Sequence, residues 1–238
     1  MALPKLQTPT YELEQPSNNE KIKYRPFLVK EQKVLMMASE SGDEKQIRDS
    51  LADIINTCTF GKVDAYTIPM FDVEFLFLRI RGKSVGEKVE LNLTCPDDNE
   101  TKVEVSLNLE DVGVSMKDGH TNTIEITDKI KIIMKYPTIN DMMGVSNVND
   151  DKGDVDKILD VMKKCVHEIH DGETVHSKID ISESDLTEFV DSLTTGQFES
   201  ITQFFDSMPK VVHVIEVTNP KTKKKGEVVI EGIGSFFE

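Results

Sequence analysis

The amino-acid sequence predicts an α+β protein built from helical lobes and antiparallel β-hairpins. Three observations carry this prediction. Apolar and polar residues alternate in pairs of segments that flank proline-containing turns, which is typical of hairpins. Between those pairs, apolar residues recur at helical spacing behind capping residues. The order along the chain is hairpin, helices, β-ribbon, helices, β-ribbon, which differs from the strand–helix alternation of a parallel sheet.

The N-terminal half is expected to hold one hairpin, three helices and a ribbon. Its third helix, MFDVEFLFLRIRGKS, begins after Pro69 and is apolar on nearly every side, so it belongs in a core or against another chain. The other expected elements are strands around residues 11–13 and 22–24, a helix over 30–39, a helix capped by Asp43 with Gln46 three residues on, and a ribbon of residues 89–93 and 103–107.

The C-terminal half is expected to be mainly helical and to close with a second ribbon. Ser182 opens one helix, and Thr194 with Gln197 forms a capping box for another, which Pro209 ends. A further helical stripe consists of Val155, Ile158, Leu159, Met162, Val166 and Ile169. The expected strands cover residues 123–126, 130–134, 211–217 and 228–230.

This organisation predicts two domains, residues 1–136 with the first ribbon and residues 137–238 with the closing hairpin. The segment Asn147–Gly153 is acidic and rich in turn-forming residues. It is therefore a candidate mobile loop or boundary between lobes.

The composition argues against several classes of function. The 238 residues carry 28 basic and 43 acidic side chains, a net charge of −15, whereas a nucleic-acid binder neutralises phosphates with lysine and arginine. Three widely spaced cysteines argue against a disulfide framework and favour a reducing compartment. The longest apolar run, Phe71–Ile80, is too short to span a bilayer, and the N-terminus lacks an apolar signal segment. We expect no nucleic-acid or membrane partner.

The motifs that would support catalysis or cofactor binding are incomplete. Gly82-Lys83-Ser84 ends like a phosphate-binding loop, but Phe77 stands where that loop needs glycine. Residues 147–158 have the early ligand spacing of a calcium loop without its glycine or its final glutamate. We therefore expect no enzyme activity, no cofactor and no metal site.

One cluster of side chains leaves a metal-dependent enzyme open as an alternative. Cys165, His167, His170 and His176 lie close together in the sequence and could form a metal site. The other interpretation is the C-terminus of a helix, where histidines complement the helix dipole.

The two β-ribbons resemble zinc ribbons, in which each knuckle carries Cys-Pro-x-Cys. The first knuckle keeps Cys95 and Pro96 but has Asp98 at the second ligand position. The second, Thr218–Lys221, has no cysteine. We therefore predict ribbon-like hairpins that lack a full set of metal ligands, and two unrelated hairpins are the alternative.

Several segments resemble one protein family. They are ALPKLQTPTYELEQP, IKYRPFLVKEQKVLMMASES and CTFGKVDAYTIPMFDVEFLFLRIRGKSVGEKVEL in the N-terminal half, and FFDSMPKVVHVIEVTNPKT and EGIGSFFE at the C-terminus. These resemble the T4-type bacteriophage baseplate protein family, whose myovirus members are described as baseplate hub subunits or hub assembly proteins. The resemblance is weakest over residues 117–182.

The resemblance implies a non-enzymatic structural or assembly role in the baseplate hub, through contacts with other hub or tail proteins. It implies the virion tail baseplate, or the host cytoplasm during assembly, as the location. A virion component and a transient assembly chaperone both remain open, and so does a regulatory binder of a host protein. The sequence sets no oligomeric state.

We expect partner contacts from apolar and arginine side chains, which often form binding surfaces. Arg79 and Arg81 could orient partner carboxylates, or stay in solvent and complement the helix dipole. The C-terminal aromatics could instead fold back onto their own core. The acidic charge could maintain solubility or complement a basic partner. The expected contact residues are Arg25, Phe27, Phe71, Phe75, Arg79, Arg81, Phe236 and Phe237.

Overall fold

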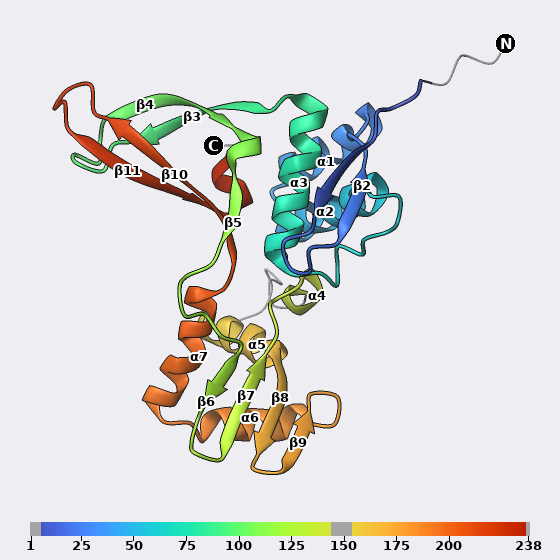
Figure 1. Ribbon diagram of the computed structural model, residues 1–238, viewed down its shortest axis with the longest axis vertical. Helices are drawn as coiled ribbons and strands as arrows, with labels where there is room; N and C mark the ends of the chain where they lie inside the picture. The colour runs from blue at the N-terminus through green and yellow to red at the C-terminus, as the bar shows by residue number, and fades with distance from the viewer. Residues whose placement is uncertain (1–5, 144–153, 237–238) are drawn as a thin grey trace. The chain divides into compact units, whose positions relative to one another are not determined.

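The computed structural model describes residues 6–143 and 154–236 and confirms the α+β class (Figure 1). The chain divides into two compact units, Met1–Ser115 with Lys210–Glu238, and Met116–Pro209. The predicted boundary after residue 136 falls inside the second unit, because strand β7, Ile130–Met134, pairs with β8, Val166–Asp171. The predicted loop Asn147–Gly153 lies outside the described residues.

Helix α3, Met70–Val85, is the centre of the first unit. It packs against helix α2, Glu44–Cys58, and α2 in turn packs against α1, Val29–Ser41. Leu76, Leu78 and Ile80 are almost completely buried. The apolar run predicted from the sequence is therefore a core helix of this chain.

A hairpin at the start of the first unit is tied to α3 by a buried carboxylate. Strands β1, Tyr11–Glu14, and β2, Lys21–Tyr24, pair as predicted. In the turn between them, Gln15 Nε2 donates to Asp72 Oδ2 at 2.6 Å and the Ser17 N–H donates to Asp72 Oδ1 at 3.1 Å. Burial raises the pKa of Asp72, and the hydrogen bonds from Ser17 and Gln15 only partly offset this rise.

The predicted ribbons form the remaining layer of the first unit. Strands β3, Lys88–Thr94, and β4, Lys102–Asn108, make a two-stranded sheet. Strands β10, Lys210–Thr218, and β11, Lys225–Glu231, make a second sheet, to which the unpredicted strand β5, Gly113–Ser115, adds on the other edge of β10. Their buried residues form one apolar cluster with α3: Leu78, Val89, Leu91, Leu107, Leu109, Val112, Val211, Ile215, Val217 and Ile230. The short helices η1, Leu109–Asp111, and η2, Ile233–Phe236, follow β4 and β11.

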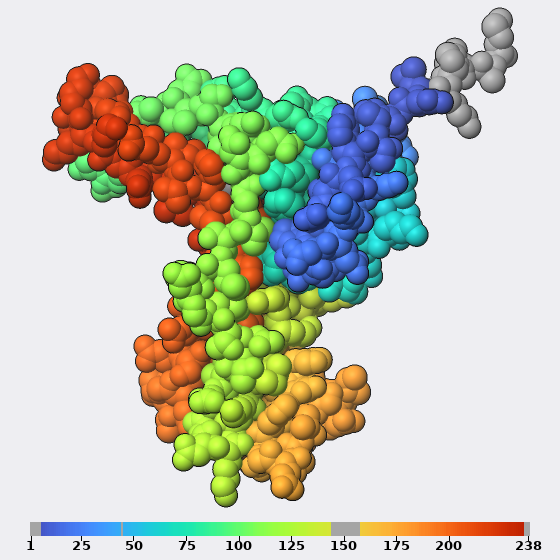
Figure 2. Space-filling view, viewed as in Figure 1, coloured from blue at the N-terminus to red at the C-terminus, as the bar shows by residue number. Residues whose placement is uncertain are grey.

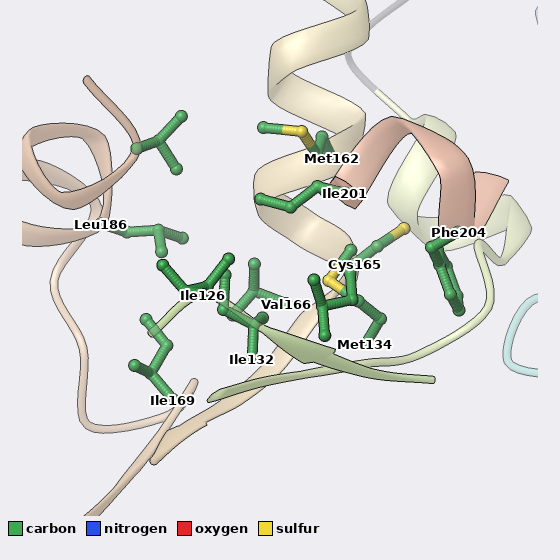
Figure 3. Packing of buried hydrophobic residues seen from close by; sticks show 12 residues of the cluster. Ile126, Ile132, Met134, Met162, Cys165, Val166, Ile169, Leu186, Ile201 and Phe204 are labelled. Carbon is green, nitrogen blue, oxygen red and sulfur yellow. The ribbon is translucent and has the colours of Figure 1, made fainter. Parts of the chain in front are cut away.

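The second unit is a four-stranded antiparallel sheet packed against helices. The strand order is β6, Thr123–Glu125, then β7, β8 and β9, Thr174–Ser177. Its helices are α4, Ile139–Met142, α5, Asp154–Cys165, α6, Glu183–Asp191, and α7, Thr195–Ser207. The core lies between the sheet and helices α5, α6 and α7, and includes Ile132, Met162, Leu186, Ile201 and Phe204 (Figure 3).

The helical stripe predicted to run from Val155 to Ile169 is wrong beyond residue 165. Helix α5 ends at Cys165, and Val166 and Ile169 belong to strand β8. The reason is long-range: Ile169 pairs with Ile132 of β7 on one side and with His176 of β9 on the other. A short apolar run alone cannot distinguish a buried strand from a helix end. The caps predicted at Asp43, Ser182 and Thr194 are all confirmed.

We predict that the D72A variant destabilises the first unit. The substitution removes the carboxylate that accepts from the buried Gln15 side chain and from the N–H of the exposed Ser17, which we expect to lower the free energy of unfolding by about 1–3 kcal/mol. Removing the burial cost of the carboxylate offsets part of the loss. Urea unfolding measures the effect, and hydrogen exchange should rise in the β1–β2 turn. An E12A control, at an exposed and weakly paired position, should change stability by less than about 0.5 kcal/mol. Equal stability of D72A and E12A would contradict this prediction.

Candidate functional site

Helix α1 carries the densest group of exposed apolar side chains in the described part of the chain. Val29, Met36 and Met37 are 67%, 55% and 70% exposed. Leu28 and Val34 beside them are also exposed. Large exposed apolar patches on a folded protein typically mark interaction sites.

Five residues share the outward side of α1, which we call the α1 face: Val29, Lys33, Met36, Met37 and Glu40. Their spacing of i, i+4, i+7, i+8 and i+11 places them within about 100° of arc on a helix. All five are exposed. Three apolar side chains and two opposite charges are therefore presented together.

The opposite side of α1 packs on α2. Ala38 is buried there, and Leu35 is half-buried. The sequence runs Val34-Leu35-Met36-Met37, and four consecutive residues cannot all lie on one side of a helix. Because only the narrow stripe of α1 that faces α2 is buried, the other apolar residues of the helix are exposed to solvent.

The start of α1 is fixed by a buried ion pair. Glu31 accepts a hydrogen bond from the Leu28 N–H at 2.6 Å, and Arg25 Nη2 lies 3.0 Å from Glu31 Oε1. Burial by itself would raise the pKa of Glu31, but the hydrogen bonds from Arg25 and Leu28 outweigh it and lower that pKa. Arg25, which the sequence predicts as a contact residue, thus holds α1 in place.

Other predicted contact residues line the interior of the first unit. Phe27 is buried, and its N–H donates to Ser84 Oγ at 2.9 Å. Phe71 is buried and Phe75 is half-buried. The structure therefore places these rings in packing positions, and their role in contacts stays a prediction.

The two predicted arginines of α3 differ in their surroundings. Arg79 donates to the carbonyl oxygens of Leu109 and Val112, the second at 2.7 Å, and its guanidinium lies 4.6 Å from the centre of the Phe75 ring. Arg81 is half-buried, and burial lowers its pKa. Arg79 therefore ties η1 and the chain after it to α3.

The C-terminal pair lies at the limit of the described chain. Phe236 is the last residue of η2, and its side chain is not described. Phe237 lies outside the described residues. Contacts through this pair stay a prediction.

The candidate metal-binding residues are not brought together. Cys165 is fully buried, which raises its pKa to about 12. His170 Nε2 lies 2.8 Å from Glu168 Oε2, His167 is exposed on β8, and His176 stands on the neighbouring strand β9. Within residues 6–143 and 154–236, no group of three or more histidines, cysteines or carboxylates is arranged to hold a metal ion. The predicted helix C-terminus is also wrong here, because the histidines lie on strands.

The two ribbon knuckles, Cys95–Asn99 and Asn219–Lys223, have the same backbone form. In each, the fifth residue donates its N–H to the carbonyl of the first, at 3.0 Å and 2.9 Å. That fifth residue has a positive φ, 54° at Asn99 and 63° at Lys223. We call these two segments the knuckle pair.

The knuckle pair is joined by hydrogen bonds from the second knuckle to Asp97 and Asp98 of the first. Asn219, which is 1% exposed, donates from Nδ2 to Asp97 Oδ1 at 2.8 Å and to Asp98 Oδ2 at 2.9 Å. Thr222 Oγ1 donates to Asp97 Oδ2 at 2.5 Å. Asp98 also accepts hydrogen bonds from the Thr101 side chain and backbone, and these bonds lower its pKa. The two ribbons therefore form one connected structure.

The close approach of the two hairpins requires glycine at one position. A Cβ atom at Gly226 would lie 2.5 Å from Pro96 Cγ. Figure 2 shows the green and red hairpin ends meeting at one end of the first unit. A side chain at residue 226 would push the knuckles apart.

Two surface cavities are the other candidate sites. One, of about 650 Å³, lies beside the β1–β2 hairpin and is lined largely by charged and polar residues. The other, of about 330 Å³, lies in the second unit and is lined by apolar side chains with His176, Asp171, Asp180 and Asp185. No hydrogen bond or ion pair joins His176 to those carboxylates in the described residues, so the structure shows no assembled acid–base pair there.

Comparison with known proteins gives one match. A family model described as "T4 bacteriophage base plate protein" matches residues 8–238. Searches of curated proteins and of solved structures return no match.

Among the described helices, none is both long and apolar enough to cross a membrane.

We predict that N219A destabilises the first unit. The variant removes two donated hydrogen bonds, and it also removes the Oδ1 acceptor used by the N–H groups of Lys221 and Thr222. Because Asn219 is buried, we expect the free energy of unfolding to fall by about 1–3 kcal/mol in urea titrations. N92A, an asparagine exposed on β3, is the matched control. Wild-type stability of N219A would show that the knuckle contact contributes nothing.

We also predict that E31Q weakens the attachment of α1 in a pH-dependent way. At neutral pH we expect a loss of about 1–2 kcal/mol, because the nearly buried Arg25 keeps its charge while its carboxylate partner becomes a neutral amide. The pKa of Glu31 is lowered in the folded state, so its stabilisation is complete above the ordinary glutamate pKa and disappears as pH falls through the lowered value.

The difference between wild type and E31Q should therefore shrink as pH falls below about 4. Urea titrations from neutral to acidic pH measure it, with E90Q on the exposed side of β3 as control. A difference independent of pH would contradict the role assigned to the Arg25–Glu31 pair.

Proposed function

The chain belongs to the T4 bacteriophage base plate protein family, and from this membership we propose that it is a non-enzymatic subunit or assembly factor of the tail baseplate hub. It acts through protein–protein contacts made by the α1 face. Its partners are other hub or tail proteins. It works in the virion baseplate, or in the host cytoplasm while the hub is assembled.

The α1 face is the observation that carries this proposal. It exposes Val29, Met36 and Met37 on a helix whose other side is held by α2 and by the Arg25–Glu31 pair. A rigidly held apolar patch loses little conformational entropy when it binds. Methionine side chains also adapt their shape to an uneven partner surface.

The net charge of −15 supports a basic partner. Long-range attraction between an acidic subunit and a basic hub surface would speed encounter and fall with rising salt. The apolar α1 face would then supply contacts that persist at high salt.

We predict that the double variant M36K/M37K loses partner binding without losing stability. The two lysines replace side chains already exposed, so stability should change by less than about 1 kcal/mol, whereas burying them in an interface would be costly. The measurement is affinity purification of tagged protein from infected cells, with the co-purifying tail proteins quantified.

I179K is the matched control, because Ile179 is 94% exposed and lies in the second unit. We expect it to recover tail proteins as wild type does. Equal recovery by M36K/M37K and I179K would reject the α1 face as the contact site. Mass spectrometry of purified virions then separates a virion component, which is present, from a transient chaperone, which is absent.

A further inference from the structure

The α1 face contains two uncompensated charges in addition to its apolar residues. Lys33 and Glu40 stand on the same side of the helix as Met36 and Met37, and both are exposed. Within the described residues neither charge has an ion-pair partner, so both are free to pair with a second molecule. The two charges thus flank the methionines at opposite ends.

This arrangement is complementary to itself. In an antiparallel helix pair with a two-fold axis between Met36 and Met37, each Met36 lies opposite Met37 of the second copy. The same axis places each Lys33 opposite Glu40 of the second copy. Along the length of the helix pair, the two methionine pairs would lie in the middle, and one ion pair would lie toward each end.

We propose that the occupant of the α1 face is a second copy of this chain, bound through an antiparallel α1–α1 helix pair. This inference rests on the proposed function, in which the α1 face is the contact site, and it deepens it: a second copy of this chain is one of the proteins that the face binds. Two-fold dimers are the commonest symmetric oligomers, and they require a surface that complements itself. Helices of neighbouring subunits pack at 8–10 Å, a distance that methionine side chains fill.

Charge reversal provides the test of this register. In K33E both charged positions of the face are acidic, and in E40K both are basic. In a dimer of either single variant, residue 33 of one copy therefore meets a like charge at residue 40 of the other. The double variant K33E/E40K restores opposite charges in exchanged places. An equimolar mixture of the two single variants also matches, because an all-acidic face meets an all-basic face.

The experiment is sedimentation velocity of the full chain over a roughly hundredfold range of concentration. Wild type should move from the 26.8 kDa monomer to twice that mass as concentration rises. K33E and E40K alone should each dimerise at least about tenfold more weakly, while the double variant and the mixture should recover dimerisation. K88E, a lysine exposed on β3, controls for the change in net charge.

Each outcome decides the proposal. A wild-type chain that stays monomeric throughout overturns it, and so does a dimer that responds to neither the single variants nor their mixture. A monomeric wild type whose M36K/M37K variant still loses tail proteins would reject the dimer and retain the proposed function. Thermal melting of each variant verifies that it is folded.

Discussion

The burial of α3 is the constraint on which the first unit depends. A helix that is apolar on nearly every side must be covered by other elements on most of its surface, because exposed apolar surface is unfavourable in water. Helix α2 covers one side, while η1, β5 and β10 contact others. Asp72 fixes its first turn to the β1–β2 turn. The enclosure draws on both ends of the chain, which explains why Lys210–Glu238 belongs to the first unit while the residues before it do not.

The exposure of α1 follows from the same arrangement. Helix α2 packs against both α3 and α1, so α1 forms an outer layer with one neighbouring helix. An outer helix can bury one stripe, yet α1 has apolar residues on more than one side. The Arg25–Glu31 pair keeps it in place where apolar packing is thin. The α1 face is therefore a surface that the described part of the chain leaves uncovered.

The sequence predicts most of the elements but not the surfaces. Helix caps such as Asp43 and Thr194 are local chemistry, and they are found where expected. The helical pattern does not predict strand β8, because the strand forms by pairing with β7, whose residues lie more than thirty positions away in the sequence. Arg25 and Arg79 are predicted as contact residues from their charge. Within the chain they bind Glu31 and the carbonyls of Leu109 and Val112, which depends on packing that the sequence pattern does not show. The position of α2 decides which residues of Val34-Leu35-Met36-Met37 face outward. The apolar periodicity of α1 does not show where α2 lies.

The knuckle pair joins the two ribbons through side-chain hydrogen bonds. A structural zinc ion can contribute about 10–16 kcal/mol to the folding of a small domain, whereas a few hydrogen bonds contribute about 1 kcal/mol each. The Asn219–Asp97–Asp98 bonds therefore fix how the hairpin ends meet but supply little of the energy that holds the ribbons. That energy has to come from their apolar inner faces, where Leu91, Ile215 and Ile230 pack in one cluster with Leu78 of α3. The ribbons thus depend on the same buried helix that organises the rest of the first unit.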